Sequence, residues 1–176
     1  MAVTQQLARV TAPYVAACRR AAGTDPDSDH GWDPPSADCL DLDWAPALLQ
    51  CAAEAARLAP THLAALVQAT DGDDAPPCDL AFLNAHPHAI GPFGPVPTLL
   101  SAPAVARVSA HLDAIDFHAV LARLPADPRS ASAVLGHGAD RITGGPHAYL
   151  LRHFQALRAF YADAARRGLV VVLWWD

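Results

Sequence analysis

The chain has 176 residues, of which 52% are hydrophobic and 17% are charged, and its formal net charge is −6. This charge argues against a nucleic acid or an anionic membrane surface as the main partner. All 12 basic residues are arginine, so Schiff-base and P-loop chemistry, which both require a lysine, are excluded. The length fits a single domain that spans residues 1–176, and no apolar run approaches the roughly 20 residues that a membrane-spanning helix needs.

The first six residues carry neither the basic region nor the apolar region of a secretory signal, so the sequence predicts a cytoplasmic protein. The four cysteines include no CxxC pair, the spacing that indicates a zinc or redox site. In the cytoplasm such cysteines are expected to be free thiols that pack as small hydrophobic side chains. No cofactor and no metal are predicted.

The first third of the chain predicts one strand, two helices and a long loop. Residues 3–10 mix apolar and polar side chains at strand spacing, and Thr11 is a suitable N-cap for a helix that ends at about residue 22. The Asp-Pro and Pro-Pro pairs of residues 24–38 predict a loop. Asp43 is then expected to cap a second helix, which ends before residue 60.

The middle of the chain predicts shorter elements. Thr61 is a suitable cap for a short helix through Val67. The apolar residues 80–83 predict a buried strand, and residues 98–100 a second, brief strand. Between them, residues 84–97 are rich in histidine, glycine and proline and are expected to be irregular.

The last part of the chain gives the clearest pattern. Ser101 is expected to cap a third main helix, residues 117–124 to add a further turn or two, and residues 125–146 to form a long loop. Residues 146–167 carry an apolar stripe at helical spacing. The unbroken apolar run of residues 169–175 predicts a strand that is buried on both faces and central in its sheet.

These elements predict an α+β protein with one domain. Its small mixed sheet is expected to include the N-terminal and the C-terminal strands and to pack against several helices.

Several segments resemble the YfbM-like family of bacterial proteins. Residues 149–161, with Ala164-Ala165 and the strand at residues 170–174, are similar to the end of that family, a helix of the form YLLxxFxxLxxFYxxAAxxG and an apolar strand. Residues 40–43 are similar to its LDLD turn, and residues 94–101 to its glycine-rich loop and next helix start. The resemblance implies an α+β fold and a bacterial protein. It implies no activity, because the family has none assigned.

The chain departs from the family directly after the LDLD turn. There the family usually has a lysine, a tryptophan and two histidines, whereas this chain has Trp44, Pro46, Ala47 and Gln50. A function that depends on those polar groups in relatives must use other groups here.

Three aspartates, Asp25, Asp27 and Asp29, alternate in the manner of the start of a calcium loop. An EF-hand loop also requires glycine at its sixth position and glutamate at its twelfth, and these positions hold His30 and Ser36. A solvated loop is therefore the favoured interpretation.

His86 and His88 are two residues apart and could bind a transition metal if a third ligand folded over them. Candidates for that ligand are His30, His137, His147 and Asp79. No HExxH or similar ligand spacing is present, so we retain His86 and His88 as binding candidates without a metal.

His111 and His118 flank Asp113 and Asp116, and a His–Asp pair can serve as a base and the group that orients it. The sequence contains no GxSxG nucleophile, so an exposed polar helix face is favoured.

Two glycine-rich stretches, at residues 136–138 and 144–145, could present amide groups to an anion before a helix. A GxGxxG motif is missing, and the glycines are explained more simply by the turn that leads into the last helix.

Trp32 lies in the acidic loop and is the tryptophan most expected to be exposed, which suits an anchor for a protein partner. An aromatic side chain that ties down its own loop explains it equally well. The leading hypothesis is a non-enzymatic binding or protein-interaction domain that uses Trp32, His86 and His88. The alternatives are a small hydrolase-like enzyme with a His/Asp pocket, with or without a metal, and an oligomer formed through an apolar helix face.

Overall fold

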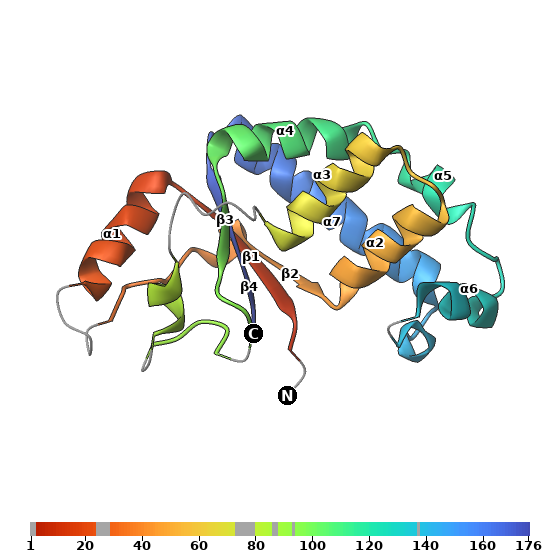
Figure 1. Ribbon diagram of the computed structural model, residues 1–176, viewed down its shortest axis with the longest axis horizontal. Coiled ribbons are helices and arrows are strands. Elements are labelled where there is room, and N and C mark those ends of the chain that lie inside the picture. Colours follow the sequence, from red (N-terminus) through yellow and green to blue (C-terminus); the bar gives the residue numbers. More distant parts are fainter. Residues whose placement is uncertain (1–2, 24–28, 73–79, 86–87, 93, 137) are drawn as a thin grey trace.

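The structure is a computed structural model that describes most of the chain (Figure 1). The described residues are 3–23, 29–72, 80–85, 88–92, 94–136 and 138–176. Within these ranges, no helix has the length and apolar character needed to cross a membrane.

The sheet has the strand order β2-β1-β4-β3. Its strands are β1 (Gln5–Val10), β2 (Cys39–Asp43), β3 (Thr98–Leu100) and β4 (Val170–Trp175). The predicted α+β class and the presence of both terminal strands are confirmed. The prediction of a mixed sheet was wrong, because β1 runs antiparallel to β2, and β4 runs antiparallel to both β1 and β3.

The helices of the described residues begin largely where the sequence supplies a cap or a proline. They are α1 (Ala12–Ala22), α2 (Ala45–Ala55), α3 (Pro60–Asp71), α4 (Ala102–Asp113), α5 (Phe117–Leu121), α6 (Pro128–Leu135) and α7 (Pro146–Arg166). Short 3₁₀ helices are η1 (Ser36–Asp38), η2 (Ala81–Asn84) and η3 (Ala139–Arg141). Thr11 caps α1 and Ser101 caps α4 as predicted, each by accepting a hydrogen bond from a first-turn amide.

The larger hydrophobic core lies on one face of the sheet, where α2 to α7 gather (Figure 1). Leu7, Leu100 and Val171, one from each of three strands, belong to this core and are fully buried. Phe117 of α5 stacks on Phe154 of α7 with 4.1 Å between their ring centroids. Burial of these side chains is the main force that holds the helices on this face.

A smaller core lies on the opposite face, which α1 and η2 cover (Figure 1). It contains Ala8 of β1, Val172 of β4, Val15 of α1 and Leu83 of η2. All of residues 170–173 in β4 are buried. The predicted burial of the terminal strand on both faces is therefore confirmed.

The predicted strand at residues 80–83 was wrong, because this segment contains the 3₁₀ helix η2. Leu80 and Leu83 are both buried, at 1% and 0% exposure. A 3₁₀ helix has three residues per turn, so it directs these two side chains toward the same core, whereas a strand would direct them to opposite faces.

The predicted long loop at residues 125–146 was also wrong in part, because it contains α6 and η3. The Asp127 carboxylate caps α6 by accepting a hydrogen bond from the amide of Ser130 at 2.8 Å. Ala131 and Leu135, which lie one turn apart, bury the inner face of this helix.

Helix α3 differs from the prediction at both ends. Its N-cap is Ala59 rather than Thr61, and Pro60 supplies the first helical position with a suitable φ angle. The helix continues past Val67 to Asp71 because Ala69, in its last turn, is also buried.

Four charged side chains join β1, η1 and the C-terminal end of α7. Nε of Arg9 lies 2.9 Å from Asp38, and Nη1 of Arg9 lies 3.2 Å from Asp163. Arg167 contacts the same two carboxylates, at 2.5 and 3.0 Å. Arg9 and Asp38 are only 14% and 17% exposed, so this network is better shielded from water than an ordinary surface ion pair.

We expect this network to make stability depend on pH in the acid range. Hydrogen bonds from Arg167 and Arg9 lower the pKa of Asp38 from 3.8 to about 2. As the pH falls, the Asp38 carboxylate is therefore protonated in the unfolded chain before it is protonated in the folded protein. The stabilisation is present above the unfolded pKa and is lost as the pH falls toward the folded pKa. The free energy of unfolding, measured with urea at several acid pH values, should depend less steeply on pH for Asp38→Asn than for the wild type.

The exposed Asp113→Asn is the control and should keep the pH dependence of the wild type. An equal pH dependence of Asp38→Asn and the wild type would contradict the prediction.

Candidate functional site

Trp32, the tryptophan predicted to contact a partner, lies against the smaller core. Its ring centroid is 5.7 Å from that of Tyr14 and 6.1 Å from that of Trp174, and the side chain is partly buried. This arrangement matches the alternative in which one aromatic side chain ties down the acidic loop. Trp44, in contrast, has 48% of its surface exposed.

Of the two histidines predicted for binding, His88 is exposed and His86 lies outside the described residues. Nε2 of His30 lies 2.6 Å from the backbone oxygen of His88, and Nδ1 of His30 accepts a hydrogen bond from the amide of Trp32 at 3.1 Å. Since Nδ1 accepts, Nε2 must carry the ring proton and donate it to His88. Both nitrogens of His30 are thus occupied, and neither is free to bind a metal.

The other predicted metal ligands do not come together within the described residues. There, no group of three or more His, Cys, Asp or Glu side chains could hold a metal ion. Asp25, Asp27, Asp79 and His137 lie outside the described residues.

The predicted His–Asp cluster is divided between two helices. His111 lies on α4, where its ring centroid is 5.4 Å from that of His62 on α3. His118 lies on α5 and is exposed. Asp116 caps α5 by accepting a hydrogen bond from the amide of Ala119 at 3.1 Å, so this carboxylate has a structural role.

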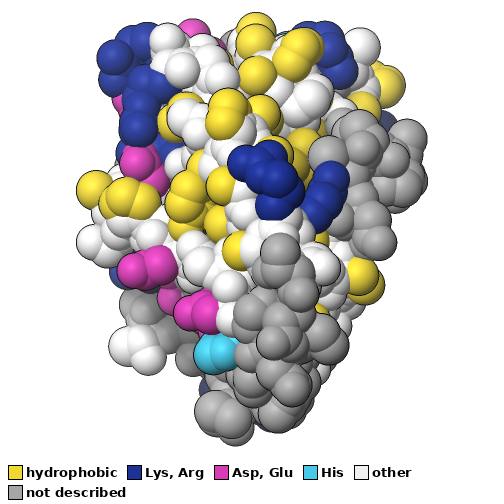
Figure 2. Space-filling model, turned by 90° about the vertical axis from the view of Figure 1, so that its left-hand side faces the viewer, with side chains coloured by type: hydrophobic (Ala, Val, Ile, Leu, Met, Phe, Trp, Pro, Cys, Tyr) yellow, Lys and Arg dark blue, Asp and Glu magenta, His cyan; other side chains and the backbone are white. Residues whose placement is uncertain are grey.

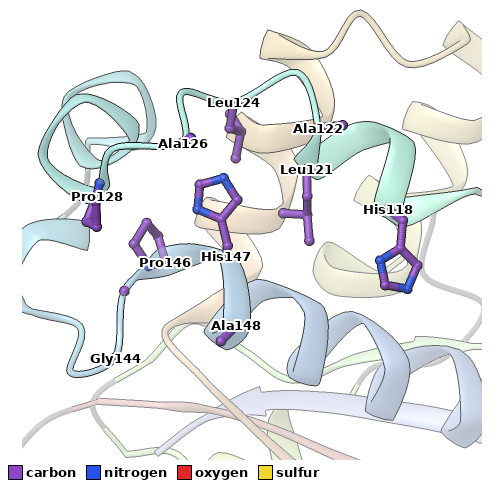
Figure 3. A pocket seen from close by; sticks show the side chains of 11 residues that line it. His118, Leu121, Ala122, Leu124, Ala126, Pro128, Gly144, Pro146, His147 and Ala148 are labelled. Atoms are coloured by element: carbon purple, nitrogen blue, oxygen red, sulfur yellow. The ribbon is translucent and has the colours of Figure 1, made fainter.

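The predicted anion site at residues 144–145 borders an apolar depression of about 570 Å³ between α5 and the start of α7 (Figure 3). Leu121 and Leu124 line it and are buried, and the ring of His147 points into it (Figure 3). Gly144 and Gly145 have φ angles of 86° and 84°. Few other residues adopt these angles, which supports the turn interpretation of the two glycines.

A second pocket, of about 330 Å³, lies where the turn between β2 and α2 meets the segment from η3 to α7. Its lining residues come from these two regions, which are about 100 residues apart in the chain. They are Asp43, Trp44, Leu48, Gly138, Arg141, Ile142, Thr143, Tyr149 and Arg152. The pocket thus lies where the end of β2, at residues 40–43, meets the start of α7, two segments that resemble the YfbM-like family.

Hydrogen bonds to Tyr149 hold the two sides of this pocket together. Its hydroxyl donates to Oδ2 of Asp43 at 3.0 Å and accepts from the amide of Trp44 at 3.2 Å. The prediction that Asp43 caps α2 was wrong, because Trp44 is the N-cap and no side chain caps the helix. The φ angle of Asp43 is 53°, a strained value for a residue other than glycine, and its carboxylate bonds to α7 instead.

Burial and neighbouring charges fix the protonation of the polar groups beside the pocket. Burial and the Asp43 carboxylate raise the pKa of Tyr149 far above its ordinary value, so the phenol stays protonated. Burial and the charge of Arg152 lower the pKa of His153, so this imidazole is neutral near pH 7. Nη2 of Arg152 lies 3.2 Å from Nε2 of His153, and because arginine can only donate, Nε2 is the acceptor.

The pocket also contains exposed polar side chains that a ligand can reach. Arg141 and Arg152 are exposed, and neither takes part in the ion pairs of the described residues. Trp44 is exposed and bonds through Nε1 to the backbone oxygen of Val3 at 3.1 Å. The pocket therefore offers guanidinium donors beside an indole ring, an arrangement suited to binding a negatively charged group.

Sequence reasoning missed this pocket as a site. Arg141 and Arg152 belong to no motif, and they share the pocket because η3 and the start of α7 both lie beside the turn between β2 and α2. The only signal in the sequence was the family resemblance of the two segments that meet here.

We expect Tyr149→Phe to lower the free energy of unfolding by about 1–3 kcal/mol, because it leaves a carboxylate and an amide without their partner. Chemical unfolding of the wild type and the variant measures this change. Thr143→Val, in the same pocket, should change stability by less than about 0.5 kcal/mol. A Tyr149→Phe variant as stable as the wild type would contradict the assigned hydrogen bonds.

For His30→Ala we expect a loss of about 2–4 kcal/mol, because two hydrogen bonds and a buried ring are removed together. His118→Ala changes an exposed side chain and should be close to neutral in the same unfolding measurement. Equal stability of both variants would show that His30 does not hold the segment around Trp32 against the segment around His88.

Comparison with known proteins identifies the fold. No family model and no curated protein matches the chain. A similar crystal structure is that of YfbM from Escherichia coli, a protein of unknown function, with a TM-score of 0.54 and 13% sequence identity. The alignment covers 97% of this chain and 98% of that chain. The resemblance is thereby confirmed at the level of the fold, and the chain has a YfbM-like fold.

Proposed function

We propose that this chain is a cytoplasmic bacterial binding protein that does not catalyse a reaction. Its site is the pocket that Asp43, Trp44, Arg141, Tyr149 and Arg152 line, and its ligand is small and carries a negatively charged group. The observation that carries the proposal is that two exposed arginines, which form no ion pair within the described residues, share one pocket with an exposed tryptophan.

The hydrogen bonds at the pocket favour binding over catalysis. A general acid or base needs a proton that it can exchange with the substrate near the working pH. The Tyr149 hydroxyl is bonded to Asp43 and has a strongly raised pKa, and Nε2 of His153 is bonded to Arg152. These groups support the pocket wall, whereas the arginines are available to a ligand.

The alternative is a hydrolase-like enzyme with a His/Asp pocket. In its favour, the ring of His153 lies 4.4 Å from that of Tyr149, which bonds to Asp43. Against it, His153 is only 7% exposed. Such an enzyme should turn over esters or amides in a substrate screen and lose that activity in His153→Asn.

A protein partner at Trp32 and His88 stays a second prediction. The face around α1 and η2, shown in Figure 2, carries basic and acidic side chains near one another, with hydrophobic side chains between them. This mixture supports a partner other than a nucleic acid, which would favour a continuous basic surface.

The test is a ligand-observed NMR screen of small anions and neutral compounds against the wild type, Trp44→Ala and Arg152→Ala. We expect the hits to be enriched in anions and to bind at least about 10-fold more weakly to Arg152→Ala. Arg20→Ala, an exposed arginine on α1, is the matched control. Hits that bind both pocket variants as they bind the wild type would contradict the proposed site.

A further inference from the structure

The pocket presents both signs of charge without pairing them. Asp43, Arg141 and Arg152 all line it, yet none of the ion pairs of the described residues joins the aspartate to either arginine. The Asp43 carboxylate therefore lies more than 4.0 Å from both guanidinium groups. A ligand that carries both charges can bridge this gap, whereas a simple anion would use only the arginines.

Each charged side chain has bonding capacity left for a ligand. Oδ2 of Asp43 accepts the Tyr149 hydroxyl, and Oδ1 has no partner among the described residues. Arg152 uses one N–H on His153, and the Arg141 side chain uses none within the described residues. A guanidinium has five N–H groups in a planar fork, which matches a carboxylate.

The remaining wall of the pocket is partly apolar. Leu48, Ile142 and the exposed ring of Trp44 line it, and Thr143 and Tyr149 add polar atoms. The volume of about 330 Å³ is near the lower end of the roughly 300–1,000 Å³ range of ligand pockets, so the ligand is expected to be small.

We infer that this pocket binds a free α-amino acid with an apolar side chain. The carboxylate lies between Arg141 and Arg152, the ammonium group contacts Asp43, and the side chain packs on Trp44. This inference rests on the proposed function, since it names the ligand class of the same pocket. An α-amino acid carries its two charges on one carbon, so it meets both sets of partners within a small volume.

Three probes separate the contributions of the two charges. L-leucine carries both, N-acetyl-L-leucine keeps only the carboxylate, and L-leucinamide keeps only the ammonium group. Calorimetric titration of the full chain should give the tightest binding for L-leucine. Each of the other two should bind at least about 10-fold more weakly, because each loses one set of charge-assisted hydrogen bonds.

Asp43→Asn provides the sharper test. Asparagine tolerates the positive φ angle and can still accept the Tyr149 hydrogen bond, so the pocket wall is kept. L-leucine should bind this variant about 10-fold more weakly, whereas N-acetyl-L-leucine should bind it as well as the wild type or better, because a repelling charge is gone. A purely structural effect of the substitution would weaken both probes alike.

Arg152→Lys and Arg20→Ala complete the set. Arg152→Lys keeps the charge but not the fork, so it should weaken L-leucine and N-acetyl-L-leucine and leave L-leucinamide unchanged. Arg20→Ala should leave all three unchanged. Thermal unfolding of each variant shows that it is folded before binding is compared.

The outcomes distinguish this inference from the proposed function. Equal binding of L-leucine and N-acetyl-L-leucine would overturn the amino-acid assignment and leave an anion-binding pocket. Failure to bind both L-leucine and a second apolar amino acid, L-phenylalanine, would also overturn the amino-acid assignment. The NMR screen would then still decide the proposed function. Binding of L-leucine that no pocket variant alters would overturn both.

Discussion

Burial of β4 on both faces is the constraint on which the rest of the structure depends. A strand whose residues 170–173 are all buried needs a hydrophobic layer above and below the sheet. Helix α1 and η2 supply one layer, and the helices around α7 supply the other (Figure 1). The two cores therefore meet only through the sheet. Because α7 leads directly into β4, the position of this longest helix is set by the same constraint.

Polar contacts then fix α7 at both of its ends. At the C-terminal end, Asp163 and Arg167 join Arg9 and Asp38, which ties the helix to β1 and η1. At the N-terminal end, Tyr149 bonds to the turn between β2 and α2. Hydrophobic burial is non-directional and leaves a helix some freedom to rotate about its axis, whereas hydrogen bonds are directional and fix that rotation. The pocket exists because this second contact holds the turn beside α7, with Arg152 one turn further along the helix.

The strained backbone of Asp43 is consistent with this role. A φ angle of 53° costs free energy for residues other than glycine, although less for aspartate and asparagine than for most, and other contacts compensate for it. Here the compensation includes the bond from Tyr149 and the bond from the amide of Asp43 to the Asp41 carboxylate at 2.7 Å. The same geometry leaves Asp43 lining the pocket, where a carboxylate is useful to a ligand. Strain and proposed function thus involve the same residue.

Local sequence signals predicted most of the fold. Thr11 and Ser101 cap helices as predicted, because capping depends on neighbouring residues in the chain. The strand predicted at residues 80–83 failed because a short apolar run does not distinguish a strand from a 3₁₀ turn. Helix α6 was missed because its Asp-Pro start also suits a loop.

The pocket could not be predicted from the sequence in the same way. Its charges come from two regions of the chain that only tertiary packing brings together, and Arg141 and Arg152 carry no motif. Trp32 was expected to be the exposed tryptophan, but its ring packs on Tyr14 and Trp174, whereas Trp44 is exposed. Burial of one aromatic residue over another depends on the folded loop, which composition does not specify.

A crystal structure of the protein grown with saturating L-leucine would show whether the pocket beside Tyr149 binds an amino acid. We expect one amino acid in the pocket beside Tyr149, with its carboxylate at Arg141 and Arg152 and its ammonium group at Asp43. A pocket that is empty under these conditions, or L-leucine bound with its charges directed to solvent, would contradict this expectation.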